Sequence, residues 1–109
     1  MMKSIERKAL NKIVESLKER FPERIREVYA FGSRVRGDYT AWSDFDVLIV
    51  VKDKDPSIEE EIVGLFVDEE LEIGVPFAPL IKDQRAFEKE RSFKTPFYTN
   101  ILNEGISLL

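Results

Sequence analysis

The sequence contains neither cysteine nor histidine, and these two absences exclude several kinds of site. Without cysteine there is no disulfide framework and no thiolate metal centre. Without histidine there is no Ser-His or Cys-His nucleophile pair and no imidazole ligand. A metal ion in this chain would have to be held by oxygen atoms, which favours Mg²⁺ or Mn²⁺ over zinc.

Long apolar runs are absent as well. No stretch approaches the roughly 20 apolar residues of a membrane span, and the N-terminus has no signal-peptide pattern. We therefore expect a cytoplasmic protein that makes no contact with a membrane. The formal net charge of -4 makes a nucleic-acid partner unlikely as well. The 109 residues fit a single compact domain that spans residues 1–109.

Apolar periodicity and turn residues predict helices that alternate with strands. Helices are expected over residues 3–21, 58–70, 86–91 and 97–103. Strands are expected over residues 25–31, 45–51 and 71–81. Pro76 and Pro79 either break the third strand or place it at an edge of the sheet. A capping box that begins at Ser57 and ends at Glu60 marks the start of the second helix. The fold class is therefore α/β (α+β), a small mixed β-sheet with flanking helices.

Gly32 and Ser33 follow the first expected strand directly. Gly32 lets the backbone approach a phosphate closely. Ser33 is expected to be the N-cap of a short helix that Gly37 ends, and it adds a hydroxyl and N–H groups that favour anions. Taken alone, the pair is more typical of an ordinary turn with a helix cap.

Asp44 and Asp46 open the second expected strand, and ten residues separate Ser33 from Asp44. Residues i and i+2 of a strand point to the same face, roughly 6.5 Å apart. Asp46 precedes the apolar residue Val47, where an unpaired charge would be costly to desolvate. Two such carboxylates can hold divalent cations at one mouth of the sheet. A phosphate cradle followed by metal-binding carboxylates indicates nucleotidyl transfer.

The segment from Phe31 to Val47 resembles the minimal nucleotidyltransferase family of the polymerase-beta-like nucleotidyltransferase superfamily. The shared motif is Gly-Ser, a spacer, then Asp-x-Asp. The resemblance implies transfer of a nucleoside monophosphate from an NTP, with ATP the expected substrate. It implies that Gly32 and Ser33 bind the triphosphate and that Asp44 and Asp46 hold Mg²⁺. It also implies a frequent partner, a helical HEPN-type protein in a toxin–antitoxin pair, where some members attach AMP to a tyrosine of the toxin.

Two further roles are predicted near this motif. Arg36, or alternatively Arg34, could neutralise phosphate oxygens, although either arginine could instead be a surface residue or pair with Asp38. The superfamily usually has a third carboxylate on the next strand. Glu72 is the one acidic residue within the strand core expected here, so it is the candidate third catalytic residue, with a solvated strand-edge residue as the alternative.

Two readings of the function stay open at this stage. In the first, the chain is a metal-dependent nucleotidyltransferase that modifies a hydroxyl, with a second protein or a homo-oligomer supplying acceptor selectivity. In the second, it is an antitoxin or adaptor that binds nucleotide and partner with little or no catalysis. Trp42 is expected to pack near the site rather than stack on a base. The apolar residues near the C-terminus are expected to pack over the sheet.

Overall fold

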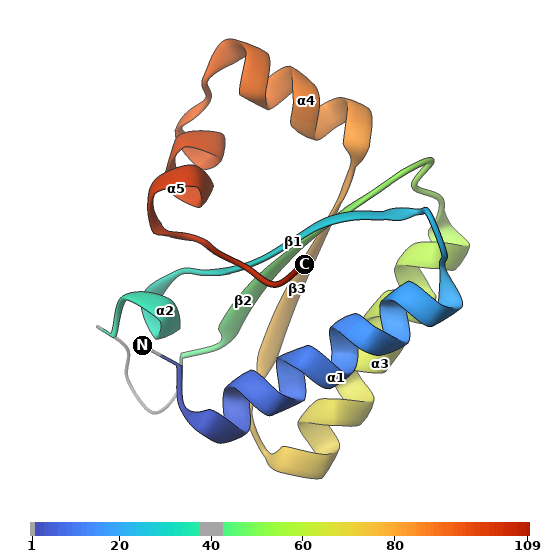
Figure 1. Ribbon diagram of the computed structural model, residues 1–109, viewed down its shortest axis with the longest axis vertical. Helices are drawn as coiled ribbons and strands as arrows, with labels where there is room; N and C mark the ends of the chain where they lie inside the picture. The colour runs from blue at the N-terminus through green and yellow to red at the C-terminus, as the bar shows by residue number, and fades with distance from the viewer. Residues whose placement is uncertain (1, 38–42) are drawn as a thin grey trace.

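A computed structural model describes residues 2–37 and 43–109, and the expectations for Asp38 and Trp42 lie outside these ranges. Within them the chain forms a four-stranded sheet in the order β3-β2-β1-β4 (Figure 1). The strands are β1 (Ile25–Phe31), β2 (Phe45–Val51), β3 (Phe77–Asp83) and β4 (Ile106–Ser107). β1 pairs antiparallel with β2 and β4, whereas β2 and β3 are parallel. The predicted mixed sheet is confirmed.

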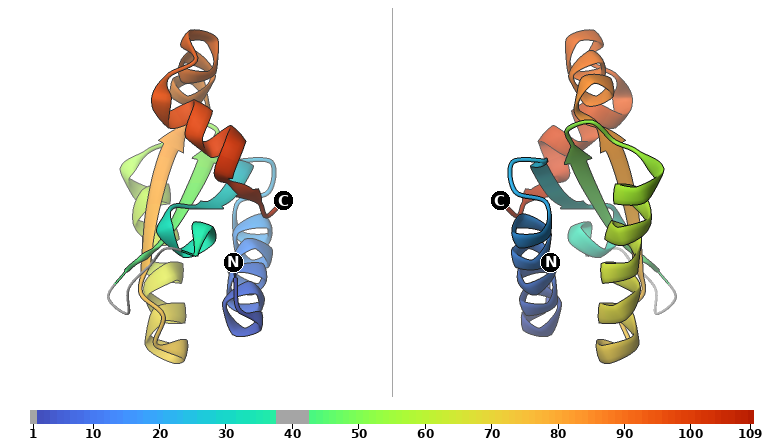
Figure 2. Two further views of the ribbon diagram at one scale, coloured as in Figure 1. Left: turned by 90° about the vertical axis from the view of Figure 1, so that its left-hand side faces the viewer. Right: turned by 90° about the vertical axis from the view of Figure 1, so that its right-hand side faces the viewer.

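Helices cover both faces of the sheet (Figure 1). They are α1 (Ser4–Arg20), α2 (Ser33–Arg36), α3 (Pro56–Ile73), α4 (Gln84–Phe93) and α5 (Pro96–Glu104). α1 and α3 pack side by side on one face, and α4 and α5 pack on the other. Figure 2 shows α4 and α5 gathered toward one end of the molecule, with the short helix α2 below them. None of the helices in the described part of the chain is long and apolar enough to cross a membrane.

The central strand β2 separates two apolar clusters. Alternate side chains point to opposite faces of a strand. Val47, Ile49 and Val51 therefore join the large cluster beneath α1 and α3, while Leu48 and Val50 join the smaller cluster with α4 and α5. All five side chains are 0% exposed, which explains why the sequence of β2 reads as an unbroken apolar run.

The region after α3 differs from the prediction. Residues 71–73 were expected in a strand, but they form the last turn of α3, and β3 begins only at Phe77. Ile73, partly buried against the large cluster, continues the apolar stripe of the helix. The helix ends where Gly74 adopts a left-handed conformation at φ 75°. The predicted capping box is also wrong at its first residue, since Asp55 is the N-cap and accepts a hydrogen bond from the Ile58 amide at 2.8 Å.

The C-terminal segment returns to the sheet. Ile101 of α5 is 2% exposed and packs with Phe87 in the smaller cluster, as expected for this apolar stretch. Phe93 and Leu102 remain 73% and 64% exposed. Directly after α5, Gly105 turns the chain into β4, a two-residue strand that the sequence analysis missed and that pairs with Ala30 through Ile106. The C-terminal end of α5 is thus tied to the sheet through β4.

Candidate functional site

The two aspartates lie where β2 enters the sheet. Asp44 is exposed and directly precedes β2, and Asp46 is the second residue of the strand. Phe45, between them, is 0% exposed and points into the cluster under α1 and α3. By alternation Asp46 shares the other face with Leu48 and Val50, the face that α5 covers. The predicted placement of both carboxylates at one mouth of the sheet is therefore consistent with the fold.

Gly32 packs directly against Asp46. Gly32 follows β1 with φ 85°, a conformation that favours glycine. A Cβ built on it would lie 2.2 Å from Oδ2 of Asp46. The register explains this contact, because Phe31, the residue before Gly32, pairs with Asp46 across β1 and β2. The Gly-Ser turn and the Asp-x-Asp strand are therefore in direct contact in the folded protein.

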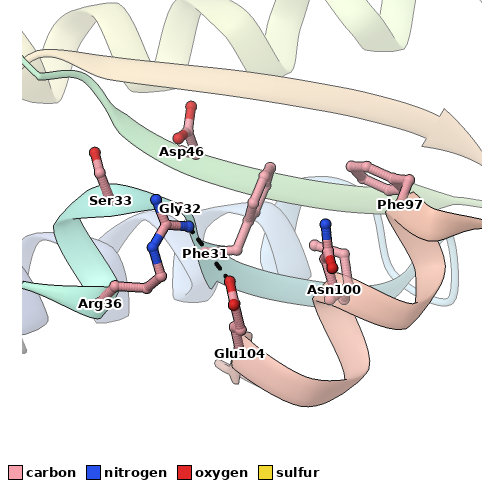
Figure 3. A pocket seen from close by; sticks show the side chains of 9 residues that line it. Phe31, Gly32, Ser33, Arg36, Asp46, Phe97, Asn100 and Glu104 are labelled. Atoms are coloured by element: carbon pink, nitrogen blue, oxygen red, sulfur yellow. Dashed lines mark hydrogen bonds and ion pairs between the residues drawn. The ribbon is translucent and has the colours of Figure 1, made fainter. Parts of the chain in front are cut away.

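The short helix α2 begins at Ser33 and ends at Arg36, as predicted, with Gly37 in the left-handed conformation at φ 88°. Its N-cap is Gly32 and not Ser33. Ser33 is instead the first helical residue, and its side chain lies beside the Gly32–Asp46 contact (Figure 3). The turn can thus present a hydroxyl and backbone to a ligand that lies over Asp46.

A pocket of about 330 Å³ opens over this contact (Figure 3). One wall comes from β1, α2 and β2, and the other comes from α5. The lining residues are Phe31, Gly32, Ser33, Arg36, Asp46, Phe97, Asn100, Ile101 and Glu104. The structure thus brings together four of the six predicted site residues, namely Gly32, Ser33, Arg36 and Asp46. Asp44 lies two residues before Asp46 in the chain and does not line the pocket. The contribution of α5 was not foreseen, because no local motif connects residues 97–104 to a site some 65 residues earlier.

Charged groups of both signs act on Asp46. Burial and, after it, the neighbouring charge of Asp44 raise the pKa of Asp46, while the charge of Arg36 acts in the opposite direction. The Nη1 atom of Arg36 lies 3.3 Å from Oε2 of Glu104, so one cation bridges α2 and α5 beside the carboxylate. A divalent cation bound at the two aspartates would offset both the burial of Asp46 and its repulsion by Asp44.

Arg34 has a different position. Its side chain is 9% exposed, and Nη1 lies 3.2 Å from Oε2 of Glu6, which is 3% exposed on α1. Its Nε donates to the carbonyl oxygen of Ser43 at 3.1 Å. Arg34 therefore connects α2 to Glu6 of α1 through an ion pair and to Ser43 through a hydrogen bond. The structure does not support Arg34 as the alternative phosphate contact, and no sequence pattern identified Glu6 as its partner.

Glu72 does not lie at this site. The prediction placed it on a strand, but it lies in the last turn of α3, 63% exposed, where Lys12 Nζ donates to it at 3.2 Å. α3 covers the sheet face opposite to α5. On β3, the residue that pairs with Asp46 is Ala78. Within residues 2–37 and 43–109 there is no group of three or more His, Cys, Asp or Glu side chains that could hold a metal ion. The β3 residue beside Asp46 is thus an alanine, and not the carboxylate that was expected on the neighbouring strand.

Known proteins carry the same domain. The family model of the nucleotidyltransferase domain matches residues 10–107, which include all of the elements around the pocket. The chain belongs to the nucleotidyltransferase domain family. A putative protein adenylyltransferase of Methanocaldococcus jannaschii is 35% identical over 100 residues, which are 92% of this chain and 94% of that protein. A second putative protein adenylyltransferase of the same organism is 31% identical over 88 residues, or 79% and 81%.

Solved structures agree with this nucleotidyltransferase assignment. A putative nucleotidyltransferase from Sulfolobus solfataricus superposes with a TM-score of 0.56 at 28% identity, over 93% of this chain and 77% of that one. A mutant of the toxin–antitoxin MntA-HpeT has a TM-score of 0.57 at 19% identity, over 91% and 71%. A toxin–antitoxin structure with AMP-PNP has a TM-score of 0.55 at 17% identity, over 91% and 72%. The last two similarities concern the fold alone.

Proposed function

We propose that this nucleotidyltransferase is a protein adenylyltransferase, which transfers AMP from ATP to a hydroxyl group of a partner protein. The observation that carries this proposal is the contact between Gly32 and Asp46 at the base of an open pocket. In this contact, the Gly32 turn is suited to bind phosphate and the Asp46 carboxylate is suited to bind a divalent cation. A nucleoside triphosphate with its metal ion has both a phosphate for the turn and a cation for the carboxylate.

The residues of the pocket take separate roles in this proposal. The backbone at Gly32 and the hydroxyl of Ser33 bind the triphosphate, and Arg36 donates charge-assisted hydrogen bonds to its oxygens. Asp44 and Asp46 hold Mg²⁺ or Mn²⁺, because the chain offers only oxygen ligands there. When bound, the metal stabilises the negative charge on the attacking and leaving oxygens.

The reaction is an in-line displacement at the α-phosphorus. The acceptor oxygen forms a bond to the α-phosphorus, the bond from that atom to pyrophosphate breaks, and the hydroxyl proton is released to solvent. The Gly32–Ser33 turn orients the triphosphate and Arg36 accommodates its charge. These residues act by position and charge, which supply most of the catalysis in phosphoryl-type transfers.

The acceptor belongs to a second protein in this proposal. Two relatives above 30% identity are named as putative protein adenylyltransferases, which favours a protein over a small molecule. Two structural neighbours are toxin–antitoxin structures, one of them with AMP-PNP, which is in keeping with a protein partner. The acceptor that we propose is a tyrosine of a HEPN-type helical partner, as the resemblance to the minimal nucleotidyltransferase family implies. The pocket is open to solvent on one side, so that an acceptor side chain can enter beside the nucleotide.

One observation favours a second candidate, an antitoxin that binds nucleotide and partner but transfers AMP slowly. Ala78 occupies the β3 position beside Asp46, where a further carboxylate would assist deprotonation of the acceptor. Both candidates require the same Mg·ATP site. They differ only in whether a bound nucleotide is turned over.

Binding of Mg·ATP tests the site that both candidates share. Titration of the wild-type chain with a fluorescent ATP analogue in Mg²⁺ should give saturable binding, and the double variant Asp44→Ala and Asp46→Ala should lose it. The matched control is Asp68→Ala, which removes a carboxylate from α3 on the other face of the sheet. Affinity in the double variant equal to that of the control would refute the site.

A further inference from the structure

The ion pair between Arg36 and Glu104 joins the two walls of the pocket. Arg36 ends α2, next to the Gly-Ser turn, and Glu104 ends α5, 68 positions later in the chain. The two side chains are 42% and 44% exposed, so both can reach a ligand in the pocket as well as each other. Figure 3 shows the pair across the pocket from Asp46, with the guanidinium between Glu104 and the Gly-Ser turn.

The backbone fixes the position of Glu104. Ile101, one turn earlier on α5, is 2% exposed and anchored in the apolar cluster. Gly105 follows at once, and a Cβ there would lie 2.5 Å from the carbonyl oxygen of Ile101. The next residue, Ile106, pairs with Ala30 in the sheet. Glu104 therefore has a defined place at the pocket even though its side chain is half exposed.

We propose that Glu104 is a positioning residue of the nucleotide site, which holds the guanidinium of Arg36 toward the triphosphate. This inference rests on the proposed function. An arginine side chain is flexible, and orienting it in advance removes part of the entropic cost of binding. A guanidinium has five N–H donors in a fixed fork, so that it can bind a carboxylate and a phosphate oxygen at the same time. Glu104 thus connects the C-terminal helix to nucleotide binding.

A role as a metal ligand is not supported for Glu104. The described residues contain no cluster of three potential ligands, and the Arg36 guanidinium lies beside the Glu104 carboxylate. A purely electrostatic role of Glu104 would change the nucleotide affinity in the opposite direction. A carboxylate near a triphosphate repels it, so loss of that charge alone would tighten binding. Orientation and repulsion therefore predict opposite changes in affinity when Glu104 is removed.

A double-mutant cycle on Mg·ATP affinity separates these roles. Arg36→Ala should weaken binding about tenfold, the scale of a charged hydrogen bond. Glu104→Ala should weaken it about threefold to fivefold, the scale of a half-exposed ion pair. The double variant should be no weaker than Arg36→Ala alone, because Glu104 acts through Arg36. Glu104→Gln, which keeps an oxygen acceptor for Nη1, should recover most of the wild-type affinity.

The control variant is Glu59→Ala. Glu59 is also 44% exposed and pairs with a cation, Lys54, at 3.4 Å, but it lies at the start of α3, away from this pocket. It should leave Mg·ATP affinity unchanged, and thermal denaturation should show that all variants are folded. The inference is overturned if Glu104→Ala binds as tightly as wild type or tighter, if its effect adds fully to that of Arg36→Ala, or if Glu104→Gln is no better than Glu104→Ala. Absence of binding in the wild type would instead overturn the proposed function.

Discussion

Gly32 and Asp46 are packed so closely that a Cβ on Gly32 would lie 2.2 Å from Oδ2 of Asp46. The contact joins the end of β1 to the start of β2, at the register position where Phe31 pairs with Asp46. Glycine is required there twice, once for its φ of 85° and once for space. The motif is therefore a physical contact as well as a sequence pattern, and a change at Gly32 must displace Asp46.

Gly32→Ala should disable nucleotide binding with only a moderate loss of stability. The new methyl group must push the Asp46 carboxylate away, and the positive φ adds strain of about 1 to 3 kcal/mol. We expect the affinity for Mg·ATP to fall more than tenfold, as measured by titration, while circular dichroism stays that of the folded protein. Wild-type affinity in this variant would contradict the proposed arrangement of the site.

Gly64→Ala is the matched control for that substitution. Gly64 lies within α3, and a Cβ there would meet nothing within 4 Å. Alanine in a helix interior is about 0.5 to 1 kcal/mol more favourable than glycine. The variant should therefore unfold at a higher urea concentration and bind Mg·ATP with unchanged affinity. A loss of stability would mean that α3 is not helical at this position in solution.

Arg34→Ala should destabilise the fold strongly. The variant leaves the carboxylate of Glu6 buried without this cation, and breaking a buried ion pair costs about 3 to 5 kcal/mol. It also removes the hydrogen bond from Arg34 to the Ser43 carbonyl, next to Asp44, so Mg²⁺ binding should weaken as well. Urea denaturation measures the first effect. Glu104→Ala breaks a half-exposed ion pair and serves as the comparison. A smaller loss of unfolding free energy in Arg34→Ala than in Glu104→Ala would contradict the buried position of Arg34.

Asp46→Asn should stabilise the metal-free protein at neutral pH. The pKa of Asp46 is raised above its ordinary value of 3.8, mainly by burial and then by the charge of Asp44. The folded state therefore binds this proton more tightly than the unfolded state, and the associated stability is present below pH 3.8 and lost as pH rises through the folded pKa. Melting temperatures in EDTA should favour Asp46→Asn at pH 7, and the advantage should shrink toward acid pH. A lower melting temperature at pH 7 would show that the ionised carboxylate is stabilised instead.

Local patterns in the sequence were sufficient for β1, α2 and β2. Their bounds agree with the prediction because each is set by a nearby signal: an apolar run, the turn at Gly32 and the stop at Gly37. The same segment carries the Gly-Ser and Asp-x-Asp motif. Local sequence signals were therefore enough to predict these three elements and the site residues that they carry.

The rest of the site depends on contacts between distant segments. Glu104 reaches the pocket only because α5 packs on Leu48 and Val50 of β2 and then returns through β4. Arg34 looked like a surface residue because its partner, Glu6, lies 28 positions away. Glu72 was predicted on a strand because Leu71 and Ile73, on either side of it, are apolar. In the structure these residues belong to α3, and Ile73 is partly buried against the large cluster. Local patterns in a single sequence do not indicate these contacts between distant segments.

The most direct test of the central claim is AMP transfer itself. The wild-type protein is incubated with ATP labelled at the α-phosphate and Mg²⁺, with and without a candidate HEPN-type partner, and the products are separated on a denaturing gel. We predict label on the partner protein that resists denaturation and disappears in the Asp44→Ala variant. Saturable Mg·ATP binding without label on any protein would contradict the transferase proposal and favour a nucleotide-binding antitoxin.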